Sequence, residues 1–276
     1  MTAIKLSSPA TREFWEIPVL LEDEHLLVLD KPSGLLTSPD AEHPERPSLM
    51  KLLHDGVTAA KPWARERKLE YLNNAHRLDF GTSGVLLLAK NKPAFLALAD
   101  AFGTDQPARK YLALVRGEPT GDTLEIEAKL APNQLKPGVM RVDHVHGKQA
   151  KTRFTVLEKF HRCGYTLLQC EPLTDRANQI SVHLQYADLK VVGDDTYGGK
   201  PLWLSSLKSD YRLKPGREER PLLARPALHA EELKLAHPIT KEALTITAPW
   251  PKDLKVAVKY LRQYAVSGVT APIEYI

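Results

Sequence analysis

Residues 76–90, HRLDFGTSGVLLLAK, constrain the fold of this 276-residue chain more than any other segment. A charged cluster at 76–79 leads into a Gly-Thr-Ser-Gly turn, and an apolar run from Val85 to Ala89 follows at once. A short, uninterrupted apolar run bounded by a turn is typical of a buried strand. The pattern therefore places one acid, Asp79, at the mouth of a tight turn beside a buried strand. Rigid elements often display catalytic groups on loops of this kind.

Asp79 has two interpretations. An Asp two residues before a Gly is an ordinary turn former, because its short side chain bonds local backbone N–H groups, and on that pattern alone a structural role is favoured. The complete string, however, resembles the signature of the RluA-type RNA pseudouridine synthases, H-R-L-D-x-x-T-S-G-x-x-x-x-A-K. The chain matches every fixed position of that signature. The resemblance implies that Asp79 is the catalytic residue.

Composition sets the broad class. With 43% hydrophobic and 26% charged residues, the chain is typical of a soluble globular protein of one large domain or two modest ones. We find neither a run long enough to span a membrane nor the apolar core of a signal peptide. Cys163 and Cys170 form no CxxC motif and join no Cys/His cluster, so we expect no disulfide framework, no metal and a cytoplasmic location. A net charge of +4 permits an RNA partner without requiring one.

Hydrophobic periodicity predicts the elements. We expect strands near 26–29, 85–89, 109–115, 123–128, 152–158, 165–171 and 244–246. We expect helices near 48–55, from Asn91 to about 102, over 180–187, and after Asp253 as a cap. The Pro-, Lys- and Arg-rich segment 199–226 is expected to be a long surface excursion. Strands outnumber helices and few strand–helix–strand units occur, which favours an α+β fold with a mixed, mainly antiparallel sheet.

The resemblance extends along most of the chain. After the signature come segments similar to further family patterns, in family order: 109–117, 147–154, 192–199 and 225–240, with 22–39 preceding it. The resemblance implies a curved mixed sheet with flanking helices and a central cleft. Residues 1–16 are expected to form a short N-terminal arm, and residues 17–276 the catalytic domain. No S4-type RNA-binding domain is expected before residue 17, so the chain resembles the family's shorter architecture.

The resemblance also suggests a substrate-binding set. Tyr111 takes the place of the family's active-site tyrosine, and the other expected contacts to RNA are His76, Arg77, Lys110 and Arg176. Each has an alternative role. Tyr111 is also consistent with a core tyrosine in a strand, His76 and Arg77 with a local ion pair, and Arg176 with a helix start. His183 and His229 are expected to be packed structural histidines.

One segment departs from the family pattern T-G-R-T-H-Q-I-R-V-H-L. Residues 174–184 are TDRANQISVHL, so Asp175, Ala177, Asn178 and Ser181 replace Gly, Thr, His and Arg. The resemblance implies that the replaced Arg pairs with the catalytic acid. Losing one partner of a buried ion pair is costly, so we expect Arg176 or Arg77 to compensate for Ser181.

The chemistry that the resemblance implies is the isomerisation of uridine to pseudouridine. It breaks an N-glycosidic bond, turns the base and rejoins it through carbon, with no need for a redox cofactor or a metal. Asp79 could act as a nucleophile at C1′ or as a base at C2′ of the ribose. The target uridine must leave its stack, which costs least in loops, so a stem-loop of rRNA or tRNA is the expected partner of a monomeric enzyme.

Two other functions were weighed. The first is an RNA-binding protein of the same fold with weakened or lost catalysis, which Ser181 motivates. The second is a glycoside hydrolase, which would need two carboxylates across one cleft. Asp194 and Asp195 are available for that role, but no sequence pattern links them to Asp79.

Overall fold

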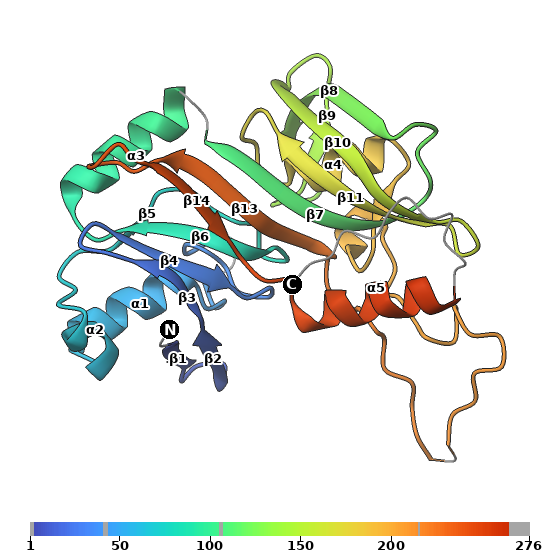
Figure 1. Ribbon diagram of the computed structural model, residues 1–276, viewed down its shortest axis with the longest axis horizontal. Helices are drawn as coiled ribbons and strands as arrows, with labels where there is room; N and C mark the ends of the chain where they lie inside the picture. The colour runs from blue at the N-terminus through green and yellow to red at the C-terminus, as the bar shows by residue number, and fades with distance from the viewer. Residues whose placement is uncertain (1–2, 41–43, 105–106, 215, 265–276) are drawn as a thin grey trace. The chain divides into compact units, whose positions relative to one another are not determined.

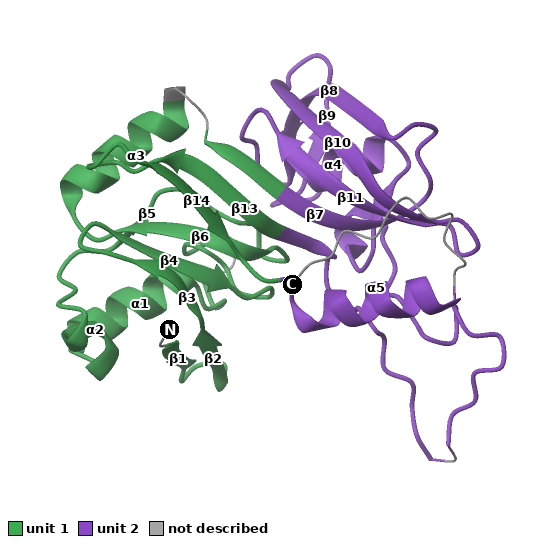
Figure 2. Ribbon diagram, in the orientation of Figure 1, with its two compact units in different colours: residues 1–110, 230–249 green, residues 111–229, 250–276 purple. Residues whose placement is uncertain are grey.

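The computed structural model describes residues 3–40, 44–104, 107–214 and 216–264 (Figure 1). The chain divides into two compact units, shown in different colours in Figure 2. Unit 1 comprises residues 1–110 and 230–249, and unit 2 comprises residues 111–229 and 250–276. The unit boundaries fall inside two strands, β7 (Ala108–Arg116) and β13 (Leu228–Ala236), and just before the last helix.

Unit 1 is built on a sheet with the strand order β3–β4–β6–β13, with β5 on β6 and β14 on β13. The bounds are β3 (Val19–Glu22), β4 (Leu26–Lys31), β5 (Asn73–Asn74), β6 (Ser83–Ala89) and β14 (Ala243–Thr247). The pairs β3·β4, β4·β6 and β13·β14 are antiparallel. Every residue of β6 is buried, as its continuous apolar run predicts, so the strand that follows Asp79 forms the centre of this core.

The helices of unit 1 begin where the sequence provides caps. Ser48 precedes α1 (Leu49–Thr58), and its hydroxyl accepts the Lys51 N–H at 3.4 Å. Asn91 precedes α3 (Lys92–Thr104), and its side chain accepts the Ala94 N–H at 3.0 Å. A short helix, α2 (Pro62–Glu66), was not predicted.

The N-terminal residues form a hairpin. Strands β1 (Ile4–Ser8) and β2 (Glu13–Ile17) make a two-stranded antiparallel sheet, and β1 packs against α1. Ile4, Leu6 and Ile17 are buried there, which explains why this short ribbon is ordered. The division of the chain into an arm over 1–16 and a domain over 17–276 stays a prediction.

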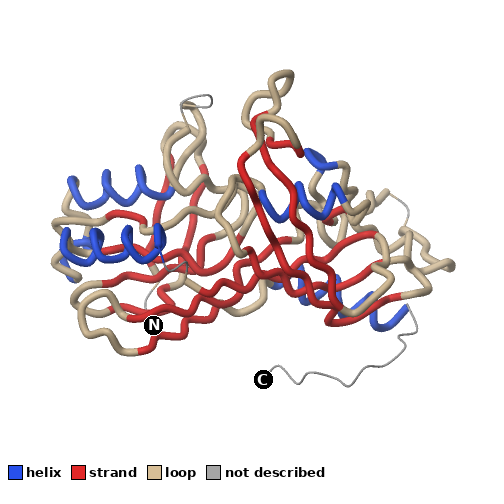
Figure 3. The backbone as a smooth tube through the Cα atoms, turned by 90° about the horizontal axis from the view of Figure 1, so that it is seen from above, coloured by secondary structure: helices blue, strands red, loops and turns tan. Residues whose placement is uncertain are grey.

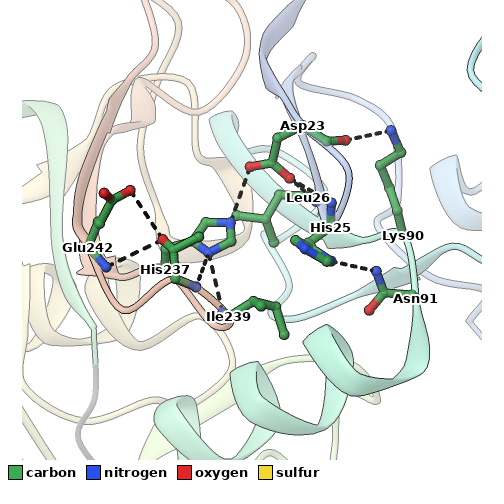
Figure 4. Close-up of polar contacts among 9 residues, drawn as sticks. Asp23, His25, Leu26, Lys90, Asn91, His237, Ile239 and Glu242 are labelled. Atoms are coloured by element: carbon green, nitrogen blue, oxygen red, sulfur yellow. Dashed lines mark hydrogen bonds and ion pairs between the residues drawn. The ribbon is translucent and has the colours of Figure 1, made fainter.

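A polar cluster ties together three turns of unit 1 (Figure 4). His237 Nδ1 accepts the N–H groups of Ile239 and Thr240, so the proton is on Nε2, which donates to Asp23 Oδ2 at 3.2 Å. Lys90 Nζ donates to the Asp23 carbonyl at 2.6 Å. Burial tends to raise the pKa of the Asp23 carboxyl, but hydrogen bonds from backbone N–H groups and His237 outweigh it and lower that pKa. The turns that join β3 to β4, β6 to α3 and β13 to β14 are therefore held as one block.

Unit 2 contains a sheet with the order β7–β11–β10–β8–β9, with β12 on β7. The bounds are β8 (Thr123–Pro132), β9 (Met140–Val142), β10 (Lys148–Phe160), β11 (Tyr165–Pro172) and β12 (Lys190–Val191). The neighbouring pairs β7·β11, β11·β10, β10·β8 and β8·β9 are antiparallel. Helix α4 (Gln179–Tyr186) packs on strands of this sheet, and strands and helices are distinguished by colour in Figure 3.

The last helix, α5 (Lys252–Tyr264), buries the predicted face of Leu254, Ala257, Val258 and Leu261. The prediction that Asp253 caps this helix is wrong, because the helix begins at Lys252 and Asp253 lies inside it. The Asp253 carboxylate instead forms a bidentate pair with Arg225, with both N–O distances at 2.7 Å. Its side chain is engaged by a distant arginine, a contact that sequence spacing cannot reveal.

The predicted fold class is confirmed: the protein is an α+β structure with a large mixed, mostly antiparallel sheet and flanking helices. The described part of 199–226 forms the long excursion expected from its composition, tied by an isolated bridge between Leu202 and Leu223 (Figure 1). Strand β13 was not predicted. In the described ranges, no helix is both long and apolar enough to cross a membrane.

Candidate active site

Asp79 is half-buried on a loop of unit 1 whose backbone is fixed by hydrogen bonds. Every carbonyl oxygen from Leu78 to Thr82 accepts one. The donors, in order along the loop, are Thr37 Oγ1 at 2.8 Å, Thr82 N at 3.0 Å, Gly34 N at 2.8 Å, Ser33 Oγ at 2.7 Å and Lys31 Nζ at 2.9 Å. Most of these donors belong to residues 31–37, so that segment holds the Asp79 loop in one conformation.

Lys31 is the most deeply placed of these donors. It is 0% exposed, and its ammonium also donates to the Pro32 carbonyl at 2.9 Å. A buried ammonium is costly unless several acceptors replace its water, and the two carbonyls supply part of that replacement. Lys31 therefore joins the end of β4 to the start of β6, the two strand ends between which Asp79 is displayed.

Two of the predicted RNA contacts, His76 and Arg77, precede Asp79, and they differ in burial. His76 is 8% exposed, its Nε2 accepts the Leu87 N–H at 3.1 Å, and its ring stacks on Phe102 at 5.2 Å between centroids. Arg77 is exposed. His76 therefore fixes the loop to β6 and α3, whereas the Arg77 side chain reaches solvent.

Gly84 ends the turn of the signature, and its place requires a glycine. Its φ is +115°, and a Cβ there would collide with the backbone carbonyl of Ala230 on β13. The close approach of two strands thus explains the glycine of the T-S-G motif. It also fixes where β6 begins relative to Asp79.

Strand β7 carries the next predicted residues. Lys110 Nζ lies 3.4 Å from Glu232 Oε1 within unit 1. The neighbouring Arg109 is only 6% exposed. Tyr111 belongs to unit 2, is 8% exposed and pairs with Cys170 of β11.

The departing segment 174–184 forms the start of α4 in unit 2. Asn178, which replaces the family's histidine, has a left-handed backbone with φ 50°, a conformation that Asn tolerates well. The side chain of Gln179 makes two hydrogen bonds: its Oε1 accepts from Thr174 Oγ1 at 2.8 Å, and its Nε2 donates to Thr152 Oγ1 at 3.0 Å. The second bond attaches the helix to β10. Arg176 donates to the Asp175 carbonyl at 2.8 Å, and its buried Nε has no hydrogen-bond partner among the residues that the structure describes.

Ser181 is buried and bonds another acid of the same unit. Its hydroxyl donates to the carboxyl of Asp194, which is 5% exposed and also accepts the Tyr197 N–H at 3.4 Å. Burial raises the pKa of the Asp194 carboxyl, and the Ser181 hydroxyl and backbone N–H groups partly oppose that rise. Sequence patterns do not reveal this pair, because the rest of α4 and β12 separate its two residues along the chain.

Asp194 also shapes the turn in which it lies. Its carbonyl accepts the Gly199 N–H at 2.7 Å, and the phenol of Tyr197 accepts the Met140 N–H at 3.0 Å. The segment 192–199, which resembles a family pattern, therefore connects α4 to the β8–β9 hairpin through hydrogen bonds. Asp194 and Asp195 belong to unit 2, and Asp79 belongs to unit 1.

Comparisons with known proteins agree with this organisation. The family described as RNA pseudouridylate synthase matches residues 25–186, more than half of the chain. The ribosomal large subunit pseudouridine synthase C of Salmonella typhi is 37% identical over 249 residues, which cover 90% of this chain and 70% of that protein. The enzyme of the same name from Escherichia coli strain K12 is 37% identical over 246 residues, covering 88% of this chain and 70% of that protein.

Solved structures support the fold. Human RNA pseudouridylate synthase domain containing 4 aligns with a TM-score of 0.64 and 22% identity, covering 88% of this chain and 92% of that one. Human RNA pseudouridylate synthase domain containing 1 aligns with a TM-score of 0.60 and 23% identity, covering 90% and 95%. The matched signature, the fold and these relatives lead to one conclusion: the chain belongs to the RNA pseudouridine synthase family.

Proposed function

We propose that Asp79 is the catalytic residue of this RNA pseudouridine synthase. The observation that carries the proposal is the Asp79 loop, in which each backbone carbonyl from Leu78 to Thr82 accepts a hydrogen bond. A catalytic group must be held in a productive position before substrate binds, and such a loop meets that need. The carboxylate would act at the ribose, as a nucleophile at C1′ or as a base at C2′.

The proposed substrate is a uridine in the RNA of the large ribosomal subunit. The relatives that share 37% of their residues with this chain are named for that activity. The target would be flipped out of its stack, which costs a few kcal/mol and least in unpaired regions. A loop of rRNA is therefore preferred, and a tRNA stem-loop is the other candidate.

The remaining site residues take different parts in this proposal. Arg77, Lys110 and Arg176 would contact phosphates through their charged ends. Tyr111 would lie against the flipped base, where aromatic stacking contributes roughly 1–3 kcal/mol. His76 is assigned to positioning the loop, because its ring nitrogen and its face are engaged inside unit 1.

The proposed setting is the cytoplasm, where rRNA is made and modified, and the proposed working form is a monomer. Cys163 and Cys170 are free thiols, as a reducing compartment would leave them. No further component enters the proposed chemistry.

The test is pseudouridine mapping of cellular RNA from cells with and without this protein. We expect one or more pseudouridines in large-subunit rRNA to disappear with the gene and to return with the wild-type gene. Asp79→Asn keeps the shape of the side chain but removes its charge and basicity, so we expect it to restore none of them. Asp55→Asn is the matched control, because that exposed carboxylate pairs with Lys51 on α1, and it should restore all of them.

Two results would contradict the proposal. Full modification by Asp79→Asn would remove Asp79 from the mechanism. Unchanged pseudouridine in every RNA of the deletion strain, together with RNA binding by the purified protein, would favour a binding protein with weakened or lost catalysis. If pseudouridines disappeared from tRNA alone, tRNA would replace rRNA as the proposed substrate, and the catalytic role of Asp79 would be unaffected.

A further inference from the structure

Phe80 is a large apolar side chain displayed at the surface directly after Asp79. It is 43% exposed, whereas Phe154 and Phe160 are 1% and 0% exposed. Single exposed apolar residues are common, so exposure alone assigns no role. Phe80 differs because its backbone is fixed: its carbonyl accepts the Gly34 N–H at 2.8 Å, within the loop held by residues 31–37. The backbone of Phe80 is therefore held in position, while its ring stays exposed.

A cation lies against this ring. The guanidinium carbon of Arg46 is 5.3 Å from the centroid of Phe80, within the range of a cation–π contact. Arg46 is exposed, and so is Arg77, three residues before Phe80 on the same loop. An aromatic face and a guanidinium plane are the two surfaces on which unstacked RNA bases stack, and arginine also binds phosphate. The charge around Phe80 thus favours a nucleic acid over an apolar peptide.

We propose that Phe80, supported by Arg46, stacks on an unpaired base adjacent to the target uridine; the proposal rests on the proposed function of Asp79. Phe80 directly follows Asp79 on the same fixed loop, and its side chain is exposed. A base beside the target uridine is therefore the nearest candidate for stacking. The family signature leaves the residue type at this position unspecified.

The probe is a transcript of the large-subunit rRNA segment that contains the mapped site. The kinetics of pseudouridine formation and the dissociation constant are measured for wild type, Phe80→Ala and Phe80→Trp. Stacking that is present in both the ground and the transition state affects KM and leaves kcat unchanged. We expect Phe80→Ala to raise KM and the dissociation constant at least about fivefold, and Phe80→Trp to restore both. Phe14→Ala, which removes another exposed phenyl of unit 1, is the control and should change neither.

Substitution of the RNA identifies the stacked base. Each nucleotide flanking the target is replaced in turn by an abasic one. At one flanking position, we expect the abasic RNA to weaken wild-type binding by the same factor as Phe80→Ala, and to have no further effect on that variant. Such non-additivity is the mark of two groups that contact each other.

Three results would overturn the stacking role. They are a Phe80→Ala dissociation constant within about twofold of wild type, additive effects at every flanking position, and a defect seen only with ribosomal particles, which would indicate a protein partner. Equal melting temperatures of the variants exclude unfolding as the cause of a defect. A wild-type protein that binds the transcript but forms no pseudouridine contradicts the role of Asp79, while the binding measurements still decide the role of Phe80.

Discussion

At the scale of single residues, the replacement of the family's arginine by Ser181 is the main departure from the family pattern. The structure gives the serine a partner of its own, the buried carboxyl of Asp194 in the same unit. Ser181 therefore takes part in a buried hydrogen bond of its own in place of the ion pair expected from the family pattern. The compensation of Asp79 by Arg176 or Arg77 stays a prediction.

The Ser181–Asp194 bond predicts a non-additive effect on stability. The native pKa of Asp194 is raised, so its contribution to stability is full below the unfolded pKa near 3.8 and is lost as the pH rises through the native value. At pH 7, Ser181→Ala should lower the free energy of unfolding by about 1–3 kcal/mol, because a buried carboxyl loses a donor. Asp194→Asn, which cannot ionise, should make the same serine substitution cost less. Urea unfolding of the two single variants and the double variant measures this.

Equal costs of Ser181→Ala in both backgrounds would contradict the bond. Ser181→Arg supplies a separate test of catalysis on total cellular RNA. We expect no gain in turnover, since the new guanidinium would meet the Asp194 carboxyl. A large gain would show that the site is impaired as it stands, and the predicted compensation would then be wrong.

At the scale of elements, two sets of hydrogen bonds determine where the Asp79 loop and helix α4 lie. Residues 31–37 hold the Asp79 loop of unit 1. In unit 2, α4 is fastened to β10 through the pairs Gln179–Thr152 and His183–Thr152, whose hydrogen bonds measure 3.0 and 2.9 Å. Both sets use polar side chains inside the fold, where an unmade hydrogen bond is expensive. Each therefore specifies one arrangement of its element.

The fastening of α4 predicts acid sensitivity. Burial lowers the pKa of His183 from 6.5 to about 4, while the Ala128 carbonyl opposes the shift. Between pH 6.5 and 4, His183 is therefore protonated in the unfolded chain but neutral in the native state. The free energy of unfolding that is present above pH 6.5 consequently declines as the pH falls through this window. The contribution is about 3 kcal/mol at most. His183→Gln, which can still bond Thr152, should flatten this part of the stability profile.

The measurement is urea unfolding at several pH values from 7.5 to 4. Carboxylates titrate in both proteins, so the difference between wild type and His183→Gln isolates the histidine. Parallel profiles over the whole range would mean that His183 titrates alike in the folded and unfolded states, contrary to its burial.

At the scale of the whole molecule, the proposed site residues are shared between the two units. Asp79, Arg77 and Lys110 belong to unit 1, and Tyr111 and Arg176 belong to unit 2. The family match, residues 25–186, includes parts of both. The net charge of +4 is too small to provide RNA affinity without local contacts.

The salt dependence of RNA binding tests those contacts. Each phosphate neutralised by Lys or Arg releases counterions, which adds roughly 0.7–0.9 to the slope of log K against log salt concentration. Arg77→Gln should therefore reduce the slope by about that amount, and Lys51→Gln, which removes an exposed cation of α1, should leave it unchanged. Filter binding of the rRNA transcript between about 50 and 200 mM salt gives the slope. A flat response for wild type would exclude phosphate contacts as the main source of affinity.

The sequence by itself determined the elements that local patterns encode. The all-apolar run 85–89, the cap Asn91 and the apolar face of α5 each depend on neighbours in the chain, so periodicity and capping rules found them. The matched signature also identified the family and Asp79 as its catalytic candidate. None of these inferences needs a contact between distant residues.

The tertiary structure alone decided how polar groups far apart in the chain are paired. Lys31 bonds the Thr82 carbonyl, Ser181 bonds Asp194, and Asp253 bonds Arg225 instead of serving as a helix cap. A hydrogen bond is directional and short, so its partner depends on backbone positions that strand register and packing set. The sequence shows which residues could pair. The fold selects the pairs, because a buried polar group left unpaired costs more free energy than most single contacts supply.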